Sequence, residues 1–480
     1  MSAKWRAGLV LVCVLVTTPA IATETRIEAR LDAALHHPGL RGASIGALVV
    51  DAADGGVLYA REPDRALVPA SNVKILTAVA ALASFGPSHR FETEVLADRV
   101  PDAEGAVSTL YVRGGGDPAL TSEELWRLAA DLRRGGLRSV RDAVVVDASL
   151  FDAEHWHPSW GRVSARAYNA PISSFSANYG AFAVQVTPGA ASGDPVRVVV
   201  DPPVVSLRLV NRARTLSPRS RMGLQVDRRV AASFEEVLIS GGLPAGADSR
   251  TLYRSVSDPV GYAAGVLRLQ LEANGIRVAE TLRREAVPDD AVSLVRFEGK
   301  SLAEVVRLFM KYSNNVIGEG LVKSLAARAG ERPAGWQQGI AAIRGELAAL
   351  GIDLGDAVQV DGSGLSYANR VAPRAFVAAL RAAAGSFRFG PEFVASLPIA
   401  AADGTLSDRA EGAALGARAK TGSLTRVTSL SGYADRRDGR RLVFSLLVNG
   451  FKRGAADAWE GVDGFLEVLV RGDDEVAAAH

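Results

Sequence analysis

The sequence predicts an α+β protein in which an antiparallel sheet, flanked by helices, is split by a large β-rich insert. Strand-like runs occur near both ends of the chain, and helical periodicity dominates residues 301–330 and 335–351. An antiparallel sheet built from the two ends, with the helices packed on it, satisfies both patterns. Between about residues 88 and 295, short β-like runs are broken by Gly and Pro. The length of 480 residues favours two or three domains.

The N-terminus has the pattern of a secretory signal peptide, residues 1–22. Lys4 and Arg6 precede the apolar run Ala7–Val16, and the small residues around Ala22 indicate cleavage after it. A membrane anchor is the alternative, although the run is shorter than the roughly 20 residues that a span needs. The only cysteine, Cys13, lies in this segment. The mature chain would then lack disulfides, thiol catalysis and cysteine–zinc sites.

Composition and charge exclude further classes of partner. The net charge of +2 provides no strong field to attract nucleic acid, and no residue cluster suggests a nucleic-acid motif. No second apolar run is long enough to span a bilayer, so we expect at most peripheral membrane association. We expect neither a metal nor a cofactor.

The first part of the chain predicts two strands and a helix. The strands lie within residues 43–62, around the turn residues Asp54-Gly55-Gly56. The Ala-rich stretch 67–82 follows as a buried helix. The insert comes next, with β-like runs at residues 108–118, 142–147 and 196–205.

The later part predicts mostly helices and one hairpin. Asp258 as N-cap, Pro259 at the first helical position and Gly275 near the end indicate a helix over residues 258–276. After the two helical stretches named above, residues 424–450 predict a hairpin that turns at 435–441. A helix over about 455–470 closes the chain.

The helix at residues 67–82 carries a hydroxyl and an amine on one face. Ser71 and Lys74 are three residues apart, so the Lys74 amine can reach the Ser71 hydroxyl. Serine is a poor nucleophile until a neighbour takes its proton. A lysine can take that proton only if desolvation and another cation lower its pKa. A solvated lysine at a helix end is the alternative, because Ser-x-x-Lys alone is a weak signal.

Two further motifs accompany this pair. Ser313-Asn314-Asn315 opens another apolar helix, and Lys420-Thr421-Gly422-Ser423 leads into the hairpin. Taken singly, the first is typical of a helix N-cap and the second of a strand end with a turn glycine. Together with Ser-x-x-Lys, and in this order, they resemble the three-part signature of penicillin-recognising serine enzymes.

The resemblance implies a catalytic role for three of these residues. Ser71 is the nucleophile and Lys74 its general base, while Ser313 relays a proton between Lys74 and the leaving amine. Asn315 holds a substrate amide.

The last motif is expected to bind the substrate. Lys420 attracts a substrate carboxylate and, as a second cation, helps to lower the pKa of Lys74. Thr421 and Ser423 offer hydroxyls to that carboxylate, and Gly422 lets the strand edge approach the ligand backbone. The amide N–H groups of Ser71 and Ser423 form the oxyanion hole.

The spacing of the motifs narrows the resemblance to one family. Ser71 and Ser313 are 242 residues apart, whereas Ser313 and Lys420 are 107 apart. A large insert between the first two motifs resembles the D-alanyl-D-alanine carboxypeptidase/endopeptidase family, the class C low-molecular-mass penicillin-binding proteins. Segments similar to this family also occur at residues 112–120, 168–180, 361–366 and 402–406.

The resemblance implies a periplasmic hydrolase of three domains. A transpeptidase-like catalytic domain would comprise residues 23–88 and 296–480, an inserted domain II residues 89–178 and 255–295, and a nested domain III residues 179–254. Members cleave the terminal D-Ala–D-Ala bond of peptidoglycan stem peptides and D-Ala–diaminopimelate cross-links, and β-lactam antibiotics inhibit them covalently.

Some positions depart from the family pattern. Asn314 replaces the Asp of many members, and Tyr367 stands where a basic residue is expected. Residues 175–180 lack the acidic residue that some members use for the diaminopimelate side chain, so carboxypeptidase activity is the firmer expectation. Asp361 and Ser363 are equally well explained as turn residues and stay outside the predicted site.

Two other functions remain as alternatives. A β-lactamase would share the motifs but needs a base for rapid deacylation, and no clear candidate Glu is evident. A peptidoglycan-binding protein with a degenerate site would be non-enzymatic, but the complete set of motifs argues against it.

The nested part of the insert carries a basic, irregular patch. A solvated surface accounts for it, and so does contact with anionic wall material or with a protein partner. The arginines concerned are Arg208, Arg212, Arg214, Arg219 and Arg221.

Overall fold

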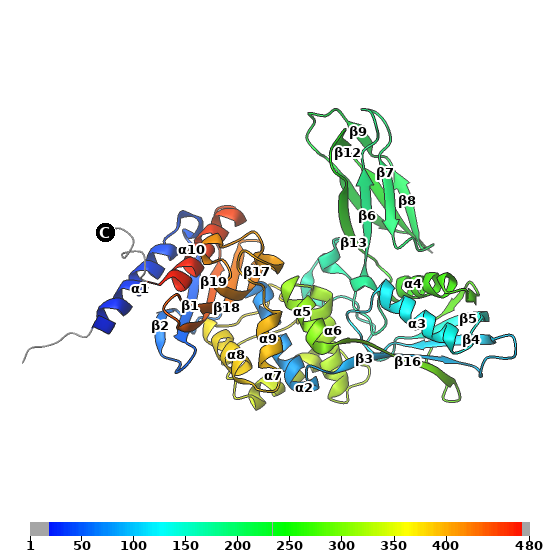
Figure 1. The fold of residues 1–480 in the computed structure, drawn as a ribbon, viewed down its shortest axis with the longest axis horizontal. Coiled ribbons are helices and arrows are strands. Elements are labelled where there is room, and N and C mark those ends of the chain that lie inside the picture. The colour runs from blue at the N-terminus through cyan, green and yellow to red at the C-terminus, as the bar shows by residue number, and fades with distance from the viewer. Residues whose placement is uncertain (1–18, 233, 473–480) are drawn as a thin grey trace, which may run out of the picture.

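The computed structural model describes residues 19–232 and 234–472, and Figure 1 shows their arrangement. Most of the predicted signal peptide therefore lies outside the described residues. Helix α1 (Pro19–Leu35) begins just before the predicted cleavage site and was not anticipated from the sequence. None of the helices in the described part of the chain is long and apolar enough to cross a membrane.

The two ends of the chain form one antiparallel sheet, as predicted. Its strands follow the order β17-β18-β19-β1-β2, and every neighbouring pair is antiparallel. The central contact pairs Ser44 with Asn449 and Asp51 with Leu442. The strands are β1 (Ser44–Asp51), β2 (Val57–Arg61), β17 (Ala417–Leu424), β18 (Val427–Asp435) and β19 (Arg441–Asn449).

Helices cover both faces of this sheet. Leu48 and Val50 of β1 join the hydrophobic core that contains α2 (Val73–Phe85) and α8 (Pro373–Gly385). The alternate residues Ala47 and Val49 join the core on the other face, which contains α1 and α10 (Ala455–Arg471). The alternation of strand side chains thus produces two cores from one strand.

Helix α2 lies at the centre of a helical layer. Residues Val73–Ala83 are all buried, which explains why the sequence is apolar around the whole helix. The surrounding helices are α5 (Leu302–Lys311), α6 (Asn315–Arg328), α7 (Trp336–Ala349), α8 and α9 (Gly390–Ser396).

The insert leaves and re-enters this layer at one place. Strand β3 (Arg90–Ala97) pairs antiparallel with β16 (Val292–Ser301), and Arg90 lies opposite Ser301. The insert sheet follows the order β14-β5-β4-β3-β16, with β15 also paired to β5. Its other strands are β4 (Ala106–Arg113), β5 (Ser139–Asp147), β14 (Arg277–Val278) and β15 (Thr281–Arg283).

The insert is less purely β-rich than the sequence suggested. The expected helix is present as α4 (Pro259–Ala273), with Asp258 as its N-cap. A second helix, α3 (Ser122–Arg134), packs beside it. Its start is stabilised by a capping box between Thr121 and Glu124, a local signal that could have identified it.

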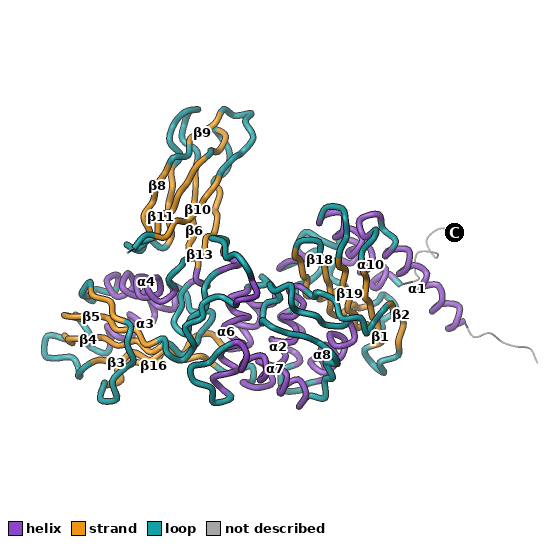
Figure 2. Tube along the Cα trace, turned by 180° about the vertical axis from the view of Figure 1, so that it is seen from behind, coloured by secondary structure: helices purple, strands orange, loops and turns teal. Residues whose placement is uncertain are grey.

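Residues 181–255 form an arm that projects from the insert (Figures 1 and 2). At its base, Ala181 of β6 (Ala181–Thr187) lies opposite Ser255 of β13 (Arg250–Ser255). The remaining strands are β7 (Arg197–Asp201), β8 (Leu207–Asn211), β9 (Arg214–Leu216), β10 (Gln225–Val230), β11 (Glu235–Ser240) and β12 (Gly242–Pro244). The three-domain division and the role of the arginine patch stay predictions.

Deleting the outer part of the arm, residues 188–248, should leave the protein able to react with penicillin. The hydroxyl oxygens of Thr187, at the end of β6, and Ser249, just before β13, lie 2.8 Å apart, so a short Gly/Ser turn can replace residues 188–248. We expect labelling by a fluorescent penicillin within about tenfold of the wild-type rate, a barrier change of ~1.4 kcal/mol, because the three motifs lie elsewhere.

The same variant should unfold cooperatively but at a lower temperature. Val226, Val237 and Ile239 of the arm belong to the core cluster that continues into the insert sheet, and the deletion removes them. Loss of labelling in a variant that still melts cooperatively would mean that the arm builds the site.

Candidate active site

Ser71 lies in a short helical turn that precedes α2. The turn, Ala70–Asn72, is packed between strand β17 and the loop at residues 361–366. A Cβ on Gly364 would lie 1.9 Å from the Ala70 carbonyl oxygen, and a Cβ on Gly422 would lie 3.0 Å from the Ser71 amide nitrogen. Two glycines therefore allow the backbone on both sides to approach the Ser71 turn.

Lys74 brings the first two motifs together. Its Nζ donates to Ser71 Oγ at 3.0 Å and to Asn315 Oδ1 at 2.8 Å. A third bond, of 2.5 Å, goes to the backbone carbonyl of Ser363. The contact between Ser71 and Lys74 that their spacing predicted is thus present, and the whole Lys74 side chain is buried.

The second motif lies where α5 gives way to α6. Ser313 adopts a left-handed backbone conformation (φ 55°), and the Asn314 side chain caps α6 by accepting from the Ile317 amide. Asn315 Nδ2 donates to the Tyr168 carbonyl at 3.0 Å. Asn315 is therefore the residue of this motif that hydrogen-bonds to Lys74, while Ser313 lies on the wall of a neighbouring cavity.

The third motif lies on β17, the edge strand beside the Ser71 turn. The Lys420 side chain is fully buried, and its Nζ donates to the Thr421 carbonyl at 2.7 Å. The hydroxyls of Thr421 and Thr405 lie 2.7 Å apart. Gly422 lies beside the Ser71 amide, and Ser423 is exposed. The strand therefore presents backbone and hydroxyl groups next to Ser71.

Tyr367, which departs from the family pattern, lies near the end of β17. Its hydroxyl oxygen accepts from the Thr425 amide at 2.9 Å, and its side chain is about half exposed. A neutral phenol thus occupies the position for which we expected a cation.

A buried carboxylate, Glu319 of α6, supports the loop beneath Lys74. Its two oxygens accept from the amides of Gly362 at 2.9 Å and Ser363 at 2.8 Å, and from Trp336 Nε1 at 2.8 Å. The Ser363 carbonyl, on the same loop, accepts from Lys74. Glu319 is therefore a positioning residue, and its oxygens are occupied away from the Ser71 hydroxyl.

Asp361 is a second carboxylate that fixes this loop. It accepts from the amides of Gly364 and Ser366 at 2.9 and 2.8 Å, and from Asn369 Nδ2 at 2.8 Å. Trp160 Nε1 of the insert donates to it at 3.0 Å. Asp361 is a turn residue, as the sequence allowed, but it also links the loop to the insert.

Sequence reasoning missed Glu319 because it is one acidic position in an otherwise apolar helix. A surface Glu would give the same pattern. Only the burial of every residue from Val316 to Ala326 distinguishes Glu319 from a surface residue, since a fully buried acid needs hydrogen-bond partners. The sequence alone does not show that burial.

Burial decides the protonation of the two lysines. It lowers the pKa of Lys74 to about 7, while the carboxylates of Glu319 and Asp361 oppose the shift. Burial also lowers the pKa of Lys420 well below its usual range, and repulsion from Lys74 lowers it further. The repulsion between the two amines is mutual, and Lys74 holds a proton more readily than Lys420 because Lys74 has more acceptors and two nearby carboxylates.

Between residues 19 and 472, leaving out residue 233, no three His, Cys, Asp or Glu side chains are grouped as a metal site requires.

The fold and this arrangement of side chains define a penicillin-recognising serine enzyme. The chain belongs to the D-Ala-D-Ala carboxypeptidase 3 (S13) family, whose model matches residues 27–469. The enzyme class is accordingly that of the serine-type D-Ala-D-Ala carboxypeptidases.

A curated relative agrees with this assignment, and solved structures share the fold. A D-alanyl-D-alanine carboxypeptidase of an Actinomadura species is 37% identical over 89% of this chain and 81% of its own. The crystal structure of penicillin binding protein 4 from Haemophilus influenzae matches with a TM-score of 0.77 and 24% identity, over 93% of this chain and 98% of its own. A predatory endopeptidase from Bdellovibrio bacteriovorus shares the fold, with a TM-score of 0.53 and 14% identity over 88% and 91% of the chains.

The acylation rate should follow the neutral fraction of Lys74. Because its pKa is lowered to about 7, the neutral amine increases as pH rises through 7, and the rate should rise there and then level off. Lys74→Arg should lose about 100-fold or more, since a guanidinium stays protonated. Labelling by a fluorescent penicillin across this range measures both effects, with the exposed Lys452→Arg as control. Acylation of Lys74→Arg near the wild-type rate would exclude the base role.

Removing the charge of Glu319 should move that pH profile. Burial raises the pKa of Glu319 to about 7, so its charge develops as pH rises through the same range. Glu319→Gln removes that charge, the larger of the two that oppose the lowering of the Lys74 pKa, so the rising limb should shift to lower pH. The plateau should fall, because an amide cannot accept all three hydrogen bonds from the loop and Trp336. Glu331→Gln, on the surface, is the matched control. An unshifted rising limb in a folded variant would contradict the electrostatic role.

Proposed function

We propose that this enzyme releases the terminal D-Ala from peptidoglycan stem peptides through an acyl-enzyme on Ser71. The observation that carries the proposal is the 3.0 Å contact between the Ser71 hydroxyl and the buried Lys74 amine. A lysine whose pKa is about 7 can accept a proton near neutral pH, which an ordinary lysine does not do.

The reaction begins when neutral Lys74 takes the Ser71 proton. Ser71 Oγ attacks the carbonyl carbon of the penultimate D-Ala, and the amides of Ser71 and Ser423 stabilise the oxyanion. The C–N bond then breaks, and the departing D-Ala amine receives a proton from Lys74 through Ser313. Water hydrolyses the Ser71 ester, releases the shortened stem and restores the hydroxyl.

The Lys420–Ser423 strand binds the terminal carboxylate. In our proposal the hydroxyls of Thr421 and Ser423 donate to it, Gly422 leaves room for the ligand backbone, and Asn315 holds a substrate amide. An anion bound here raises the pKa of the buried Lys420, which then carries the proton. The resulting charge near Lys74 favours the neutral form of Lys74, so binding of the correct terminus helps to activate the base.

We infer that the enzyme also cleaves cross-links and is periplasmic. Cross-link cleavage is the same reaction with a diamino acid amine as the leaving group, although residues 175–180 lack the acidic residue expected for its side chain. The N-terminal pattern of a signal peptide supports export to the compartment that contains this substrate. β-Lactams would acylate the same serine.

Ser71→Ala should abolish both D-Ala release and penicillin labelling while the protein still folds and melts cooperatively. Some loss of stability is expected, because Lys74 loses one of its three acceptors and retains the other two. Mass spectrometry of the wild-type adduct should locate the penicilloyl group on Ser71, and its detection on another residue would overturn the assignment. A stable adduct supports a carboxypeptidase, rapid turnover would indicate a β-lactamase, and an absence of labelling a non-enzymatic binding protein.

A further inference from the structure

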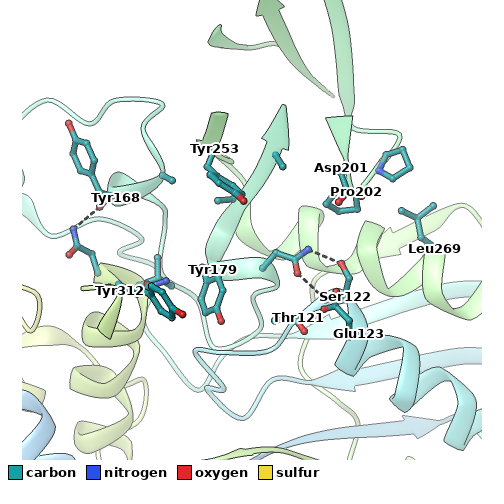
Figure 3. A pocket seen from close by; sticks show the side chains of 18 of the residues that line it. Thr121, Ser122, Glu123, Tyr168, Tyr179, Asp201, Pro202, Tyr253, Leu269 and Tyr312 are labelled. Atoms are coloured by element: carbon teal, nitrogen blue, oxygen red, sulfur yellow. Dashed lines mark hydrogen bonds between the residues drawn. The ribbon is translucent and has the colours of Figure 1, made fainter. Parts of the chain in front are cut away.

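A cavity of about 1070 Å³ opens beside the second motif and lies outside the Ser71–Lys74 pair. Its walls come from all three parts of the chain (Figure 3). Residues 312–316 form one wall, the start of α3 and helix α4 another, and the base of the arm a third. Ligand sites commonly measure about 300–1,000 Å³, so this space can hold more than one sugar ring.

Large aromatic side chains gather around this space. Tyr312, Tyr179 and Tyr253 surround it, whereas the ring of Tyr168 is turned away at its edge (Figure 3). Tyr253 and Tyr312 are 60% and 70% exposed, and both border the same cavity, so they are an exposed aromatic pair and not scattered single rings. Their flat faces are suited to stacking on the C–H faces of sugar rings.

The ring of Tyr179 is held in place by an unfavourable backbone conformation. Asn178 and Tyr179 both have left-handed conformations (φ 50° and 58°), which non-glycine residues seldom adopt. The Asn178 side chain is fixed by hydrogen bonds of 2.9 Å to the Ser122 amide and hydroxyl. Burial raises the pKa of Tyr179 to about 12, so its hydroxyl remains a hydrogen-bond donor. The fold thus maintains a fixed aromatic donor in the cavity wall.

The charges in the wall favour a neutral ligand that donates hydrogen bonds. Glu123 and Asp201 line the cavity from opposite sides, together with the amide of Gln270. None of the described residues that line it is Lys, Arg or His. Carboxylates accept hydrogen bonds from hydroxyl and N–H groups and repel anions. A stem peptide is anionic, whereas a glycan whose muramyl carboxyl is bound to that peptide is neutral.

The cavity is joined to the catalytic cleft through the second motif, because Ser313 and Asn315 both line it. Asn315 contacts Lys74 through Oδ1 and the Tyr168 carbonyl through Nδ2, and it also lines the cavity. We propose that the cavity binds N-acetylated sugars of the glycan strand that carries the substrate stem peptide. The inference rests on the proposed function, since the sugars are attached to the N-terminal end of the stem peptide whose C-terminal end is cleaved at Ser71.

The test compares one stem pentapeptide with and without its N-terminal disaccharide. For the wild type, we expect kcat/KM for D-Ala release to be about fivefold higher with the disaccharide-linked pentapeptide than with the free pentapeptide. This ratio corresponds to the binding energy of one good aromatic contact. Tyr253→Ala and Gln270→Ala should remove most of this preference and leave hydrolysis of the free pentapeptide unchanged. Tyr253→Phe should retain it, because the ring remains. Phe387→Ala, which removes a fully exposed ring that is not among the lining residues, is the matched control.

A second measurement does not depend on catalysis. Titration of the full chain with tri-N-acetylchitotriose, a neutral sugar without a peptide, should give saturable binding that Tyr253→Ala weakens. If the wild type shows no preference and no saturable binding, the inference is wrong. If Tyr253→Ala slows both pentapeptides equally, the cavity binds peptide instead of glycan. If D-Ala release and penicillin labelling both fail while sugar binding remains, the proposed function fails and the sugar site stands.

Discussion

A buried amine with three hydrogen-bond acceptors organises the centre of this protein. Burying a lysine is costly unless each of its donors is satisfied. Lys74 meets this requirement with Ser71 in the turn just before its helix, Asn315 on α6 and the Ser363 carbonyl on a distant loop. The acceptors come from segments that are far apart in the sequence. The fold must therefore bring these segments together before Lys74 can be buried.

Much of the surrounding structure serves to hold these acceptors in place. Glu319 accepts from the two amides of the Ser363 loop, and Asp361 fixes the turn within it. Gly364 lets the loop touch the Ser71 turn. The insert can be large because its ends, β3 and β16, form one antiparallel pair and leave this arrangement intact. Trp160, which donates to Asp361, is one direct link from the insert to the site.

The sequence was informative where chemistry depends on local spacing. The three-residue step from Ser71 to Lys74 fixes their contact on a helix, and alternation fixed the terminal hairpin. The sequence was not informative where a role depends on what surrounds a residue. Glu319 looks like any acidic residue in a helix until its burial is known, and the relative pKa of Lys74 and Lys420 depends on acceptors from other segments.

The two lysines show why such surroundings matter for the chemistry. Both are fully buried, and each disfavours the charge of the other, so the site does not readily carry two protons. Before substrate binds, the carboxylates of Glu319 and Asp361 favour the charge on Lys74. In the proposed mechanism, an arriving substrate carboxylate provides the missing partner for Lys420. The proton then belongs on Lys420, and Lys74 is left as the base. Selectivity for a free carboxyl terminus and activation of the serine would thus arise from one electrostatic constraint.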